Sequence, residues 1–341
     1  MIVVMAKDSS AEHIGEVERR IESHPGLKAQ VFNGIERVVI GVLGSIPPDL
    51  KDEIELLTGV LEVVPISKPY KLASREFHPD STKVVVGDVV IGGSEPVIMA
   101  GPCSVEDEEQ MVATARAVKA SGAKILRGGA YKPRTSPYSF RGMGIEGLKL
   151  LKLAKEETGL PIITEVMAPE DVETVAEYAD ILQIGARNMQ NYTLLDRVGE
   201  INKPVMVKRG LAASYEEWLL AAEYVMAGGN DQVILCERGI RSFEQYTRFT
   251  LDVAAIPVVQ RMSHLPIVAD PSHSTGRWYL VTPVALAAIA AGANGLLVEV
   301  HPNPDLAKCD GPQSLTFENF DSLMQQVRSV AAVRRSPVEV T

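Results

Sequence analysis

Eight short apolar runs alternate with helix-like segments through most of this chain, and this alternation limits its fold more than any other feature. The runs are nearly continuous in Val, Ile, Leu and Ala, as is typical of parallel strands that are buried on both faces. They lie at residues 97–101, 124–129, 161–166, 181–185, 204–210, 232–239, 266–273 and 295–301. Helix-like segments such as 106–122 and 214–229 separate them, and the second ends in glycine. The pattern therefore predicts repeated β-α units.

Eight β-α units in roughly 250 residues are typical of a (β/α)8 TIM barrel. A doubly wound sheet is the alternative, but its first strand would lead into a glycine-rich phosphate-binding turn. This chain has "AGPCSVED" at that place. A short hairpin is expected just before the first barrel strand, at residues 83–92. We therefore expect an α/β fold with a TIM-barrel domain over residues 83–341.

The first part of the chain has a different rhythm. Strand-like runs at 2–7, 28–34, 37–44 and 60–67 are interrupted by two amphipathic helical segments, the second at 49–57. Ser9 and Glu12 fit a capping box at the start of the first helix. The order β-α-β-β-α-β predicts a ferredoxin-like domain over residues 1–68. Residues 69–82 are polar and contain proline, and we interpret them as a linker.

Composition excludes several classes of partner and compartment. The net charge of −10 and the pI near 5.2 argue against nucleic acid or an anionic membrane as a partner. Three widely spaced cysteines without a CxxC motif, and no signal-like start, favour the reducing cytoplasm. The longest apolar tract, 279–300, contains Pro283 and Glu299 and reads as a buried helix and strand. We expect a soluble cytoplasmic protein.

Cations gather at the carboxyl ends of the predicted strands, where TIM barrels carry their chemistry. They are Arg127, Lys132, Arg134, Arg187, Lys208 and Arg238. Each alone fits a surface or ion-paired residue, but so many on one face cost free energy unless an anion is present. Two phosphates and a carboxylate would suit them. Thr135 and Ser136 would add neutral donors to an oxyanion.

A second set of strand-end residues could hold a metal ion: Cys103, His273, Glu299 and Asp310. Their strands, the first, seventh and eighth, are neighbours in a closed barrel. A mixed sulfur, nitrogen and oxygen set suits Mn, Fe, Co or Zn. The alternative is a buried cysteine, a histidine bonded to Asp270 and two ordinary carboxylates. His301 competes with His273 for the histidine role.

The other cysteines and acids have plainer interpretations. Cys236 lies within the sixth strand and fits core packing. Cys309, beside Asp310, is a candidate neighbour of the site, but we favour a passive thiol there. Glu237 and Asp270 are candidates either for acid–base chemistry or for orienting cations, and the sequence does not separate these roles.

Seven motifs carry a resemblance to a known family. They are "AGPCSVE", "LRGGAYKPRTSPYSF", "QIGARNMQN", "VKRG", "CERG", "DPSHS" and "VEVHP", in this order. Over essentially the whole chain the sequence resembles 3-deoxy-D-arabino-heptulosonate 7-phosphate (DAHP) synthase of type I-beta, which has an N-terminal ferredoxin-like (ACT-like) domain. The resemblance implies a transferase that condenses phosphoenolpyruvate with erythrose 4-phosphate, the first step of the shikimate pathway to the aromatic amino acids.

The resemblance also implies roles for individual residues. Phosphoenolpyruvate would be bound by Arg127, Lys132, Gly185, Ala186, Arg187, Lys208 and Arg238, and erythrose 4-phosphate by Arg134, Thr135 and Ser136. One divalent metal ion per subunit, Mn, Fe, Co or Zn, would be held by Cys103, His273, Glu299 and Asp310. Lys132, Cys103 and His273 are the implied catalytic residues. Lys132 or a metal-bound water would donate the proton to the new hydroxyl, while Glu165 or Glu237 would place the attacking water.

Two alternatives remain for the activity. The sibling 3-deoxy-D-manno-octulosonate 8-phosphate (KDO8P) synthase uses arabinose 5-phosphate, but its loop resembles "ANRSS" where this chain has "KPRTS", and it usually lacks the N-terminal domain. A non-catalytic sensor of phosphorylated metabolites would not need sites for both reactants. By resemblance, the N-terminal domain would bind tyrosine or phenylalanine as a feedback effector in a homotetramer. A structural lid or an oligomerisation element is the alternative.

Overall fold

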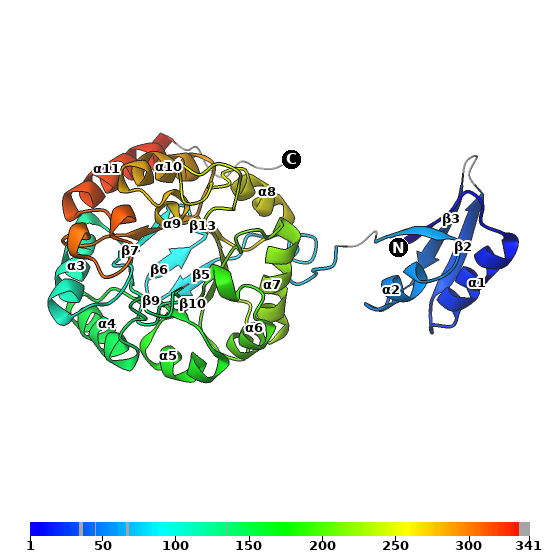
Figure 1. The fold of residues 1–341 in the computed structure, drawn as a ribbon, viewed down its shortest axis with the longest axis horizontal. Coiled ribbons are helices and arrows are strands. Elements are labelled where there is room, and N and C mark those ends of the chain that lie inside the picture. The colour runs from blue at the N-terminus through cyan, green and yellow to red at the C-terminus, as the bar shows by residue number, and fades with distance from the viewer. Residues whose placement is uncertain (34–36, 45, 66–67, 135, 334–341) are drawn as a thin grey trace. The chain divides into compact units, whose positions relative to one another are not determined.

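The computed structural model describes residues 1–33, 37–44, 46–65, 68–134 and 136–333 (Figure 1). The chain divides into two compact units between Pro69 and Tyr70. Each unit has a hydrophobic core of its own, and each is considered separately below. No helix in the described ranges is long and apolar enough to cross a membrane.

The first unit is the ferredoxin-like domain that the sequence predicts. Its strands are β1 (Ile2–Met5), β2 (Lys28–Asn33), β3 (Val38–Leu43) and β4 (Val60–Val64), and its helices are α1 (Ala11–Glu22) and α2 (Leu50–Glu55). The sheet order is β2-β3-β1-β4, and the described pairings are antiparallel. Buried residues such as Val3, Ile21 and Leu50 form a core between the sheet and the two helices. The β-α-β-β-α-β order read from the sequence therefore predicted the ferredoxin-like topology correctly.

The N-terminus of α1 differs from the prediction by one residue. Ser10, not Ser9, is the N-cap, and its side chain accepts a hydrogen bond from the backbone N–H of His13. His13 Nδ1 accepts in turn from the backbone N–H of Ser10. The hydroxyl of Ser9 instead donates to the carbonyl of Gly59. The capping box predicted at Ser9 and Glu12 is therefore wrong, because Ser9 is engaged by another element.

The second unit is a closed barrel of parallel strands in the order β10-β11-β12-β13-β14-β7-β8-β9. The strands are β7 (Val97–Gly101), β8 (Ile125–Arg127), β9 (Ile162–Val166), β10 (Ile181–Ile184), β11 (Val205–Lys208), β12 (Val233–Glu237), β13 (Ile267–Ala269) and β14 (Gly295–Glu299). Each lies within one of the predicted apolar runs, and every residue of these strands is buried. The predicted TIM barrel is confirmed.

Helices surround the barrel in Figure 1. They are α3 (Glu108–Ser121), α4 (Ile145–Thr158), α5 (Val172–Tyr178), α6 (Tyr192–Gly199), α7 (Tyr215–Ala227), α8 (Ala255–Met262), α9 (Pro271–Thr275), α10 (Trp278–Ala290) and α11 (Phe317–Val333). Their apolar side chains and the outward-facing strand residues form the larger core. Trp218 of α7 is fully buried there, and its indole N–H donates to the carbonyl of Val207 at 3.0 Å.

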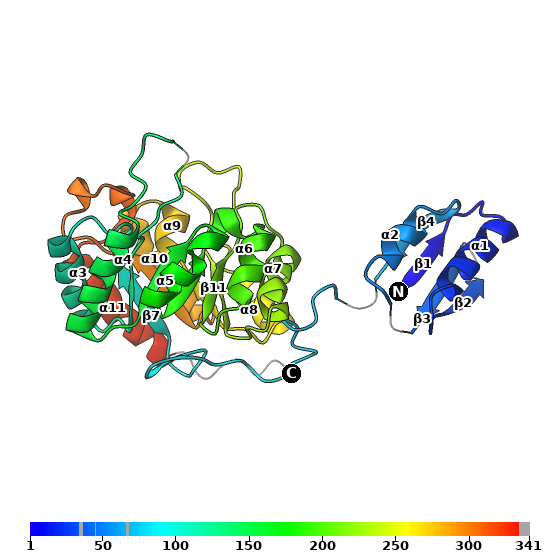
Figure 2. The same cartoon turned by 90° about the horizontal axis from the view of Figure 1, so that it is seen from below.

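A hairpin of β5 (Val84–Val86) and β6 (Val89–Ile91) closes one end of the barrel. Val84, Val86, Val89 and Ile91 pack with inward-facing strand residues such as Met206 in a second core. Figure 2 shows the hairpin (cyan) below the barrel and the long loops after β8 and β12 at the opposite end. The plugged end is therefore structural, and the open carboxyl end is free to carry a site.

The segment interpreted as a linker packs against the barrel once it has passed Pro69. Tyr70 and Ala73 are buried in the barrel's outer core. The carboxylate of Glu223 on α7 accepts hydrogen bonds from the backbone N–H groups of residues 71–73 at 2.8–2.9 Å. Arg75 donates to the carbonyl of Ser263 at 2.9 Å. Residues from Tyr70 onward therefore belong to the barrel unit.

Candidate active site

A polar cavity of about 240 Å³ opens at the carboxyl end of the barrel. The sequence-predicted residues that line it are Arg127, Lys132, Arg134, Ser136, Glu165, Gly185, Ala186, Arg187, Lys208, Arg238, His273 and Asp310. Thr135 lies outside the described residues. Side chains from strands far apart in the sequence thus share one cavity, because parallel strands of a barrel all end at the same rim.

Three arginines in the cavity, Arg134, Arg187 and Arg238, have no acidic partner among the described residues. Among the described residues, no carboxylate lies within ion-pair distance of Arg187 or Arg238. Burial lowers the pKa of Arg238, and the guanidinium groups of Arg248 and Arg187 lower it further, while Asp270 opposes them. The Arg238 guanidinium packs over the Phe249 ring, 4.3 Å from its centroid. Clustered cations of this kind are stabilised by an anionic ligand.

Arg127, at the end of β8, connects this cluster of cations to Glu299 at the end of β14. Its Nη1 donates to Glu299 Oε1 and to the carbonyl of Pro102, both at 2.9 Å. Its Nε is buried without a hydrogen-bond partner, so a donor remains for a bound anion. Burial opposes the charge of Arg127, but Glu299 raises its pKa above the ordinary value. Arg127 is therefore a permanent cation in the cavity wall.

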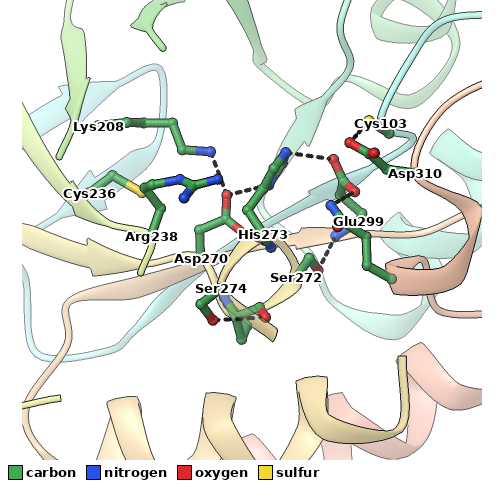
Figure 3. A network of polar contacts seen from close by, with 12 residues as sticks. Cys103, Lys208, Cys236, Arg238, Asp270, Ser272, His273, Ser274, Glu299 and Asp310 are labelled. Carbon is green, nitrogen blue, oxygen red and sulfur yellow. Dashed lines mark hydrogen bonds and ion pairs between the residues drawn. The ribbon is translucent and has the colours of Figure 1, made fainter. Parts of the chain in front are cut away.

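Cys103, His273, Glu299 and Asp310 meet beside the cavity, as Figure 3 shows. One ligand atom from each lies within 4.8 Å of all the others. Cys103 Sγ is 3.4 Å from Asp310 Oδ2, and His273 Nε2 is 3.4 Å from Glu299 Oε1. Such distances leave room for a cation with ligands at about 2.0–2.3 Å. The donor set fits a borderline divalent metal ion.

Asp270 orients His273 in this group. It is the N-cap of α9, which starts directly after β13, and its side chain accepts from the backbone N–H of His273 at 2.9 Å. Asp270 Oδ2 also lies 2.7 Å from His273 Nδ1. A carboxylate at Nδ1 holds the proton there and leaves Nε2 free to bind a metal. Burial alone would raise the pKa of Asp270, but His273 and Lys208 hold it well below its ordinary value.

The same carboxylate reaches the anion-binding side of the cavity. Lys208 Nζ at the end of β11 is hydrogen-bonded to Asp270 Oδ2. Figure 3 shows Asp270 between Lys208 and His273. One buried acid therefore links a cation that lines the cavity to a candidate metal ligand.

The remaining candidate ligands are also held by neighbours. Glu299 Oε2 accepts from Gln313 Nε2 at 2.6 Å, and the backbone N–H of Glu299 donates to Ser272 Oγ at 3.0 Å. Asp310 has a left-handed backbone with φ of 51°, which aims its carboxylate at Cys103 from the loop after β14. Burial raises the pKa of the Cys103 thiol, so a cation is needed to keep it as a thiolate.

Lys132 lies between the two groups. Its Nζ donates to both the carbonyl oxygen and the sulfur of Cys103, each at 3.1 Å. Burial would lower the pKa of Lys132, but the two neighbouring sulfurs, Cys103 and Cys309, raise it above its ordinary value. Lys132 is therefore a buried ammonium group at the boundary between the candidate metal site and the cavity.

The sequence analysis missed two residues of the site, Arg248 and Gln313, and favoured a passive thiol for a third, Cys309. Arg248 lines the cavity and lies 3.4 Å from Asp310 Oδ1, although it stands in the long loop after β12. Gln313 links Arg248 to Glu299, accepting from the first at 3.0 Å and donating to the second. Cys309 contacts Cys103. Only the short distance of Cys309 and Gln313 from Asp310 in the sequence could have suggested their place.

The structure also separates candidates that the sequence left equivalent. Glu165 lines the cavity and keeps a buried oxygen, Oε1, without a hydrogen-bond partner, while its Oε2 accepts from Gln183 at 3.1 Å. Glu237 is outside the set of cavity-lining residues and pairs with Arg209 at 2.9 Å. His301 does not belong to the candidate metal group, and its Nε2 lies 3.6 Å from Glu106. Glu165 is therefore better placed than Glu237 for a role in the cavity, and His273 is better placed than His301 to bind a metal ion.

Two family models together cover nearly the whole chain. The model described as the DAHP synthetase I family matches residues 69–333. The model described as the DAHP synthase ferredoxin-like domain matches residues 1–68. The chain belongs to the DAHP synthetase I family.

Relatives in this family include the phospho-2-dehydro-3-deoxyheptonate aldolase of Thermotoga maritima, which is 52% identical over 97% of this chain and 98% of its own length. The crystal structure of the T. maritima DAHP synthase superposes with a TM-score of 0.94 at 51% identity, covering 97% of both chains. The 2-dehydro-3-deoxyphosphooctonate aldolase of Syntrophotalea carbinolica is 34% identical, over 76% of this chain and 99% of its own length.

Proposed function

We propose that this member of the DAHP synthase family condenses phosphoenolpyruvate with erythrose 4-phosphate and water to give DAHP and inorganic phosphate. One observation carries the proposal: a cluster of cations, which includes Arg187 and Arg238 without acidic partners, and a four-residue metal-ligand group share one barrel end. The 52% identity to the T. maritima enzyme over almost the full length supports it. The phosphooctonate aldolases match at lower identity and over about three quarters of the chain.

Phosphoenolpyruvate would occupy the deeper part of the cavity. Its phosphate would be bound by Arg187 and Arg238, which lack acidic partners, and by the backbone at Gly185 and Ala186. Its carboxylate would be bound by the buried cations Arg127, Lys132 and Lys208. Guanidinium groups bind phosphate and carboxylate through paired hydrogen bonds, which fixes the orientation of the substrate as well as its position.

Erythrose 4-phosphate would lie toward the loop after β8. Arg134 and Ser136 line that side of the cavity and would bind its phosphate, together with Thr135. Pro133, between Lys132 and Arg134, restricts the backbone that joins the two sub-sites. A fixed separation brings the two reacting carbons together and lowers the entropic cost of their encounter.

Cys103, His273, Glu299 and Asp310 would hold one divalent metal ion, Mn, Fe, Co or Zn. A bound cation of this type supplies a Lewis acid for the aldehyde oxygen of the aldose. The chain's own residues prepare the site: Asp270 fixes the tautomer of His273, and Gln313 and Arg127 fix the carboxylate of Glu299.

The reaction forms a bond between C3 of phosphoenolpyruvate and the aldehyde carbon. Lys132, whose ammonium group lies beside Cys103, would give a proton to the resulting alkoxide. Water adds at C2, and Glu165, whose Oε1 has no hydrogen-bond partner, would orient this water and accept its proton. Inorganic phosphate then leaves as the bond between C2 and the phosphate-ester oxygen breaks. The oxygen atom from the added water stays on C2.

A steady-state assay of phosphoenolpyruvate consumption tests this function. Erythrose 4-phosphate and arabinose 5-phosphate should be compared side by side with added Mn²⁺, and again after treatment with EDTA. We expect turnover with erythrose 4-phosphate that EDTA abolishes. Preference for arabinose 5-phosphate would assign the chain to the phosphooctonate reaction instead, and unchanged turnover after complete metal removal would disprove the metal part.

Arg134→Ala tests the position of the second substrate. Loss of a charged hydrogen-bond donor costs about 1.5–3 kcal/mol, so the KM for erythrose 4-phosphate should rise roughly 10- to 100-fold. The KM for phosphoenolpyruvate should change far less. Arg141→Ala is the matched control, because Arg141 is exposed in the same loop and outside the cavity lining. Equal effects of Arg134→Ala on both substrates would contradict the assignment.

The ferredoxin-like unit would carry regulation. A family model for this domain matches residues 1–68. We propose, from the family resemblance alone, that this unit binds tyrosine or phenylalanine as an effector and that the chain forms a homotetramer. Inhibition of turnover by either amino acid, and the mass of the assembly in solution, test the two proposals separately.

A further inference from the structure

Arg238 is held in the cavity by an aromatic ring. Its guanidinium lies over the face of Phe249, 4.3 Å from the ring centroid, and the residue is 5% exposed. Its Nη1 also donates to the carbonyl of Gly239, at the long distance of 3.4 Å. The face of an aromatic ring carries the negative part of its quadrupole, so it attracts a guanidinium without neutralising the charge. A cation held in this way remains available to an anion.

Phe249 stands at the base of the long loop after β12, where the loop is closed by backbone hydrogen bonds. Ile240 and Thr250 exchange two of these bonds, at 2.9 and 3.0 Å, directly beside Phe249. The backbone N–H of Phe249 itself donates to the carbonyl of Ser274 at 2.7 Å. Ser274 follows the candidate metal ligand His273 in α9. The position of the ring is therefore set by the rim of the barrel.

A glycine next to Arg238 leaves the space that the ring needs. Gly239 has a φ of 93°, a backbone conformation that residues with a side chain rarely adopt. A Cβ atom at this position would lie 2.8 Å from Phe249 Cβ and 2.9 Å from Ser274 Cβ. The backbone that leaves β12 therefore packs directly against Phe249, and the ring is part of the wall that supports Arg238.

A second arginine of the cavity flanks the same ring. The Arg248 guanidinium lies 5.9 Å from the Phe249 centroid, and Arg248 Nη1 lies 3.4 Å from Asp310 Oδ1 on the candidate metal side. The ring thus lies between a cation of the proposed phosphate sub-site and a cation that contacts a candidate metal ligand. A carboxylate at this place would pair with Arg238 and compete with the substrate phosphate, whereas a neutral ring does not.

We propose that Phe249 is a positioning residue for the phosphate of phosphoenolpyruvate and that it acts through Arg238. The ring fixes the guanidinium in the cavity wall before the substrate binds, so less conformational entropy is lost on binding. It also shields the guanidinium from water, which strengthens the attraction between this cation and an anion. The inference rests on the proposed function, because it starts from the phosphate sub-site at Arg238.

Calorimetric titration of the Mn²⁺-loaded full chain with phosphoenolpyruvate measures this effect, and without the aldose there is no turnover. Phe249→Leu keeps an apolar side chain but removes the ring. Its Kd for phosphoenolpyruvate should rise roughly 5- to 30-fold, which corresponds to about 1–2 kcal/mol for a buried cation–π contact. Phe249→Tyr keeps the ring and should bind as tightly as the unmodified chain. Phe243→Leu is the matched control, since Phe243 is 97% exposed in the same loop.

A double variant shows whether Phe249 acts through Arg238. Arg238→Met removes the charge but keeps a long side chain, and it should weaken the binding of phosphoenolpyruvate by itself. In that background Phe249→Leu should add no further loss, because the group that the ring positions is gone. A full additional loss would give Phe249 a general structural role and overturn the proposal.

Steady-state kinetics with both substrates give a second readout. Phe249→Leu should raise the KM for phosphoenolpyruvate and leave the KM for erythrose 4-phosphate nearly unchanged. An unaltered Kd in Phe249→Leu, or a Kd in Phe249→Tyr as weak as in Phe249→Leu, would overturn this inference and leave the proposed function standing. Absence of phosphoenolpyruvate binding by the unmodified chain would overturn both.

Discussion

At the scale of single residues, Asp270 has the widest influence on the site. Its carboxylate accepts from His273 Nδ1 and from Lys208, so it touches both the candidate metal group and the anion-binding side. Asp270 is fully buried, so water does not compete with His273 and Lys208 for its carboxylate. The relation between the two halves of the cavity is therefore set by one side chain.

Asp270→Asn should weaken metal binding by about 10- to 100-fold. An amide can present its N–H₂ group to His273 Nδ1, which favours the tautomer with the proton on Nε2 and blocks the ligand atom. Binding of Mn²⁺ can be measured by titration calorimetry on the metal-free chain. Asp180→Asn is the control, since Asp180 precedes β10 at the other end of the barrel and pairs with Lys155. Equal metal affinity in both variants would show that Asp270 is not needed to orient His273.

Gly185→Ala should reveal how tightly Glu165 is packed. The backbone of Gly185 is ordinary, with φ of −66°, but an added Cβ would lie 2.0 Å from Glu165 Oε1. The carboxylate must move, at a cost of about 1–3 kcal/mol in the free energy of unfolding. We also expect kcat to fall, because the moved carboxylate is the group proposed to orient water.

A second substitution distinguishes the two effects. Glu165→Asp shortens the side chain and should restore the stability of Gly185→Ala in the double variant, as measured by urea unfolding, without restoring kcat. If the double variant is no more stable than Gly185→Ala alone, contact with Glu165 is not the cause of the loss.

At the scale of elements, the segment after Pro69 is attached to the barrel through His264. Its Nδ1 is 2.6 Å from Thr82 Oγ1, and its Nε2 is 2.7 Å from the carbonyl of Leu72. The His78 ring lies 4.6 Å from the His264 ring, centroid to centroid. Burial lowers the pKa of His264, with His78 and Arg75 adding to the effect and Leu72 and Asp231 opposing it.

The stability of the barrel should therefore fall in mild acid. Because the folded pKa is lowered, the unfolded chain binds more protons, so the contribution of His264 is complete above its unfolded pKa of about 6.5 and is lost as pH falls below it. Uptake of one proton changes the free energy of unfolding by at most about 1.4 kcal/mol per pH unit. Both tryptophans, Trp218 and Trp278, lie in the barrel unit, so urea unfolding followed by their fluorescence reports this unit alone.

His264→Gln removes the titrating group while keeping an amide that can reach the Leu72 carbonyl. We expect the variant to show a shallower loss of unfolding free energy between about pH 7 and pH 5. His24→Gln, in the ferredoxin-like unit, is the control and should leave the slope of the barrel unchanged. An unaltered slope in His264→Gln would assign the acid sensitivity to another group.

At the scale of the whole molecule, the two units have separate cores. The described core of the first unit ends at Val63, and that of the barrel begins at Tyr70. A truncated form of the T. maritima DAHP synthase has been solved and matches 77% of this chain with a TM-score of 0.73. Independent cores of this kind are expected to fold independently.

A chain of residues 70–341 should therefore fold and retain turnover. Its urea midpoint, followed by tryptophan fluorescence, should lie close to that of the barrel in the full chain. Inhibition by tyrosine or phenylalanine, where the full chain shows it, should be lost. A truncated chain that is still inhibited would place the effector site in the barrel, and one that does not fold would show that the first unit is needed for stability.

The sequence alone was sufficient for the architecture. Each barrel strand is an apolar run, because a parallel strand covered on both faces must be apolar at nearly every position. Chain order then predicted which residues meet, since the carboxyl ends of all strands share one rim. The grouping of Cys103, His273, Glu299 and Asp310 followed from this rule, and the structure brings the four together.

Only the tertiary structure distinguished residues with equivalent sequence positions. Glu165 and Glu237 both stand near strand ends, but one faces the cavity and the other pairs with Arg209. The contact of Cys103 with Cys309, and that of Arg248 with Asp310, depends on loop conformations that bring distant segments together. Periodicity reports how deeply a residue is buried, whereas the choice of partner is made by the packing of segments far apart in the chain.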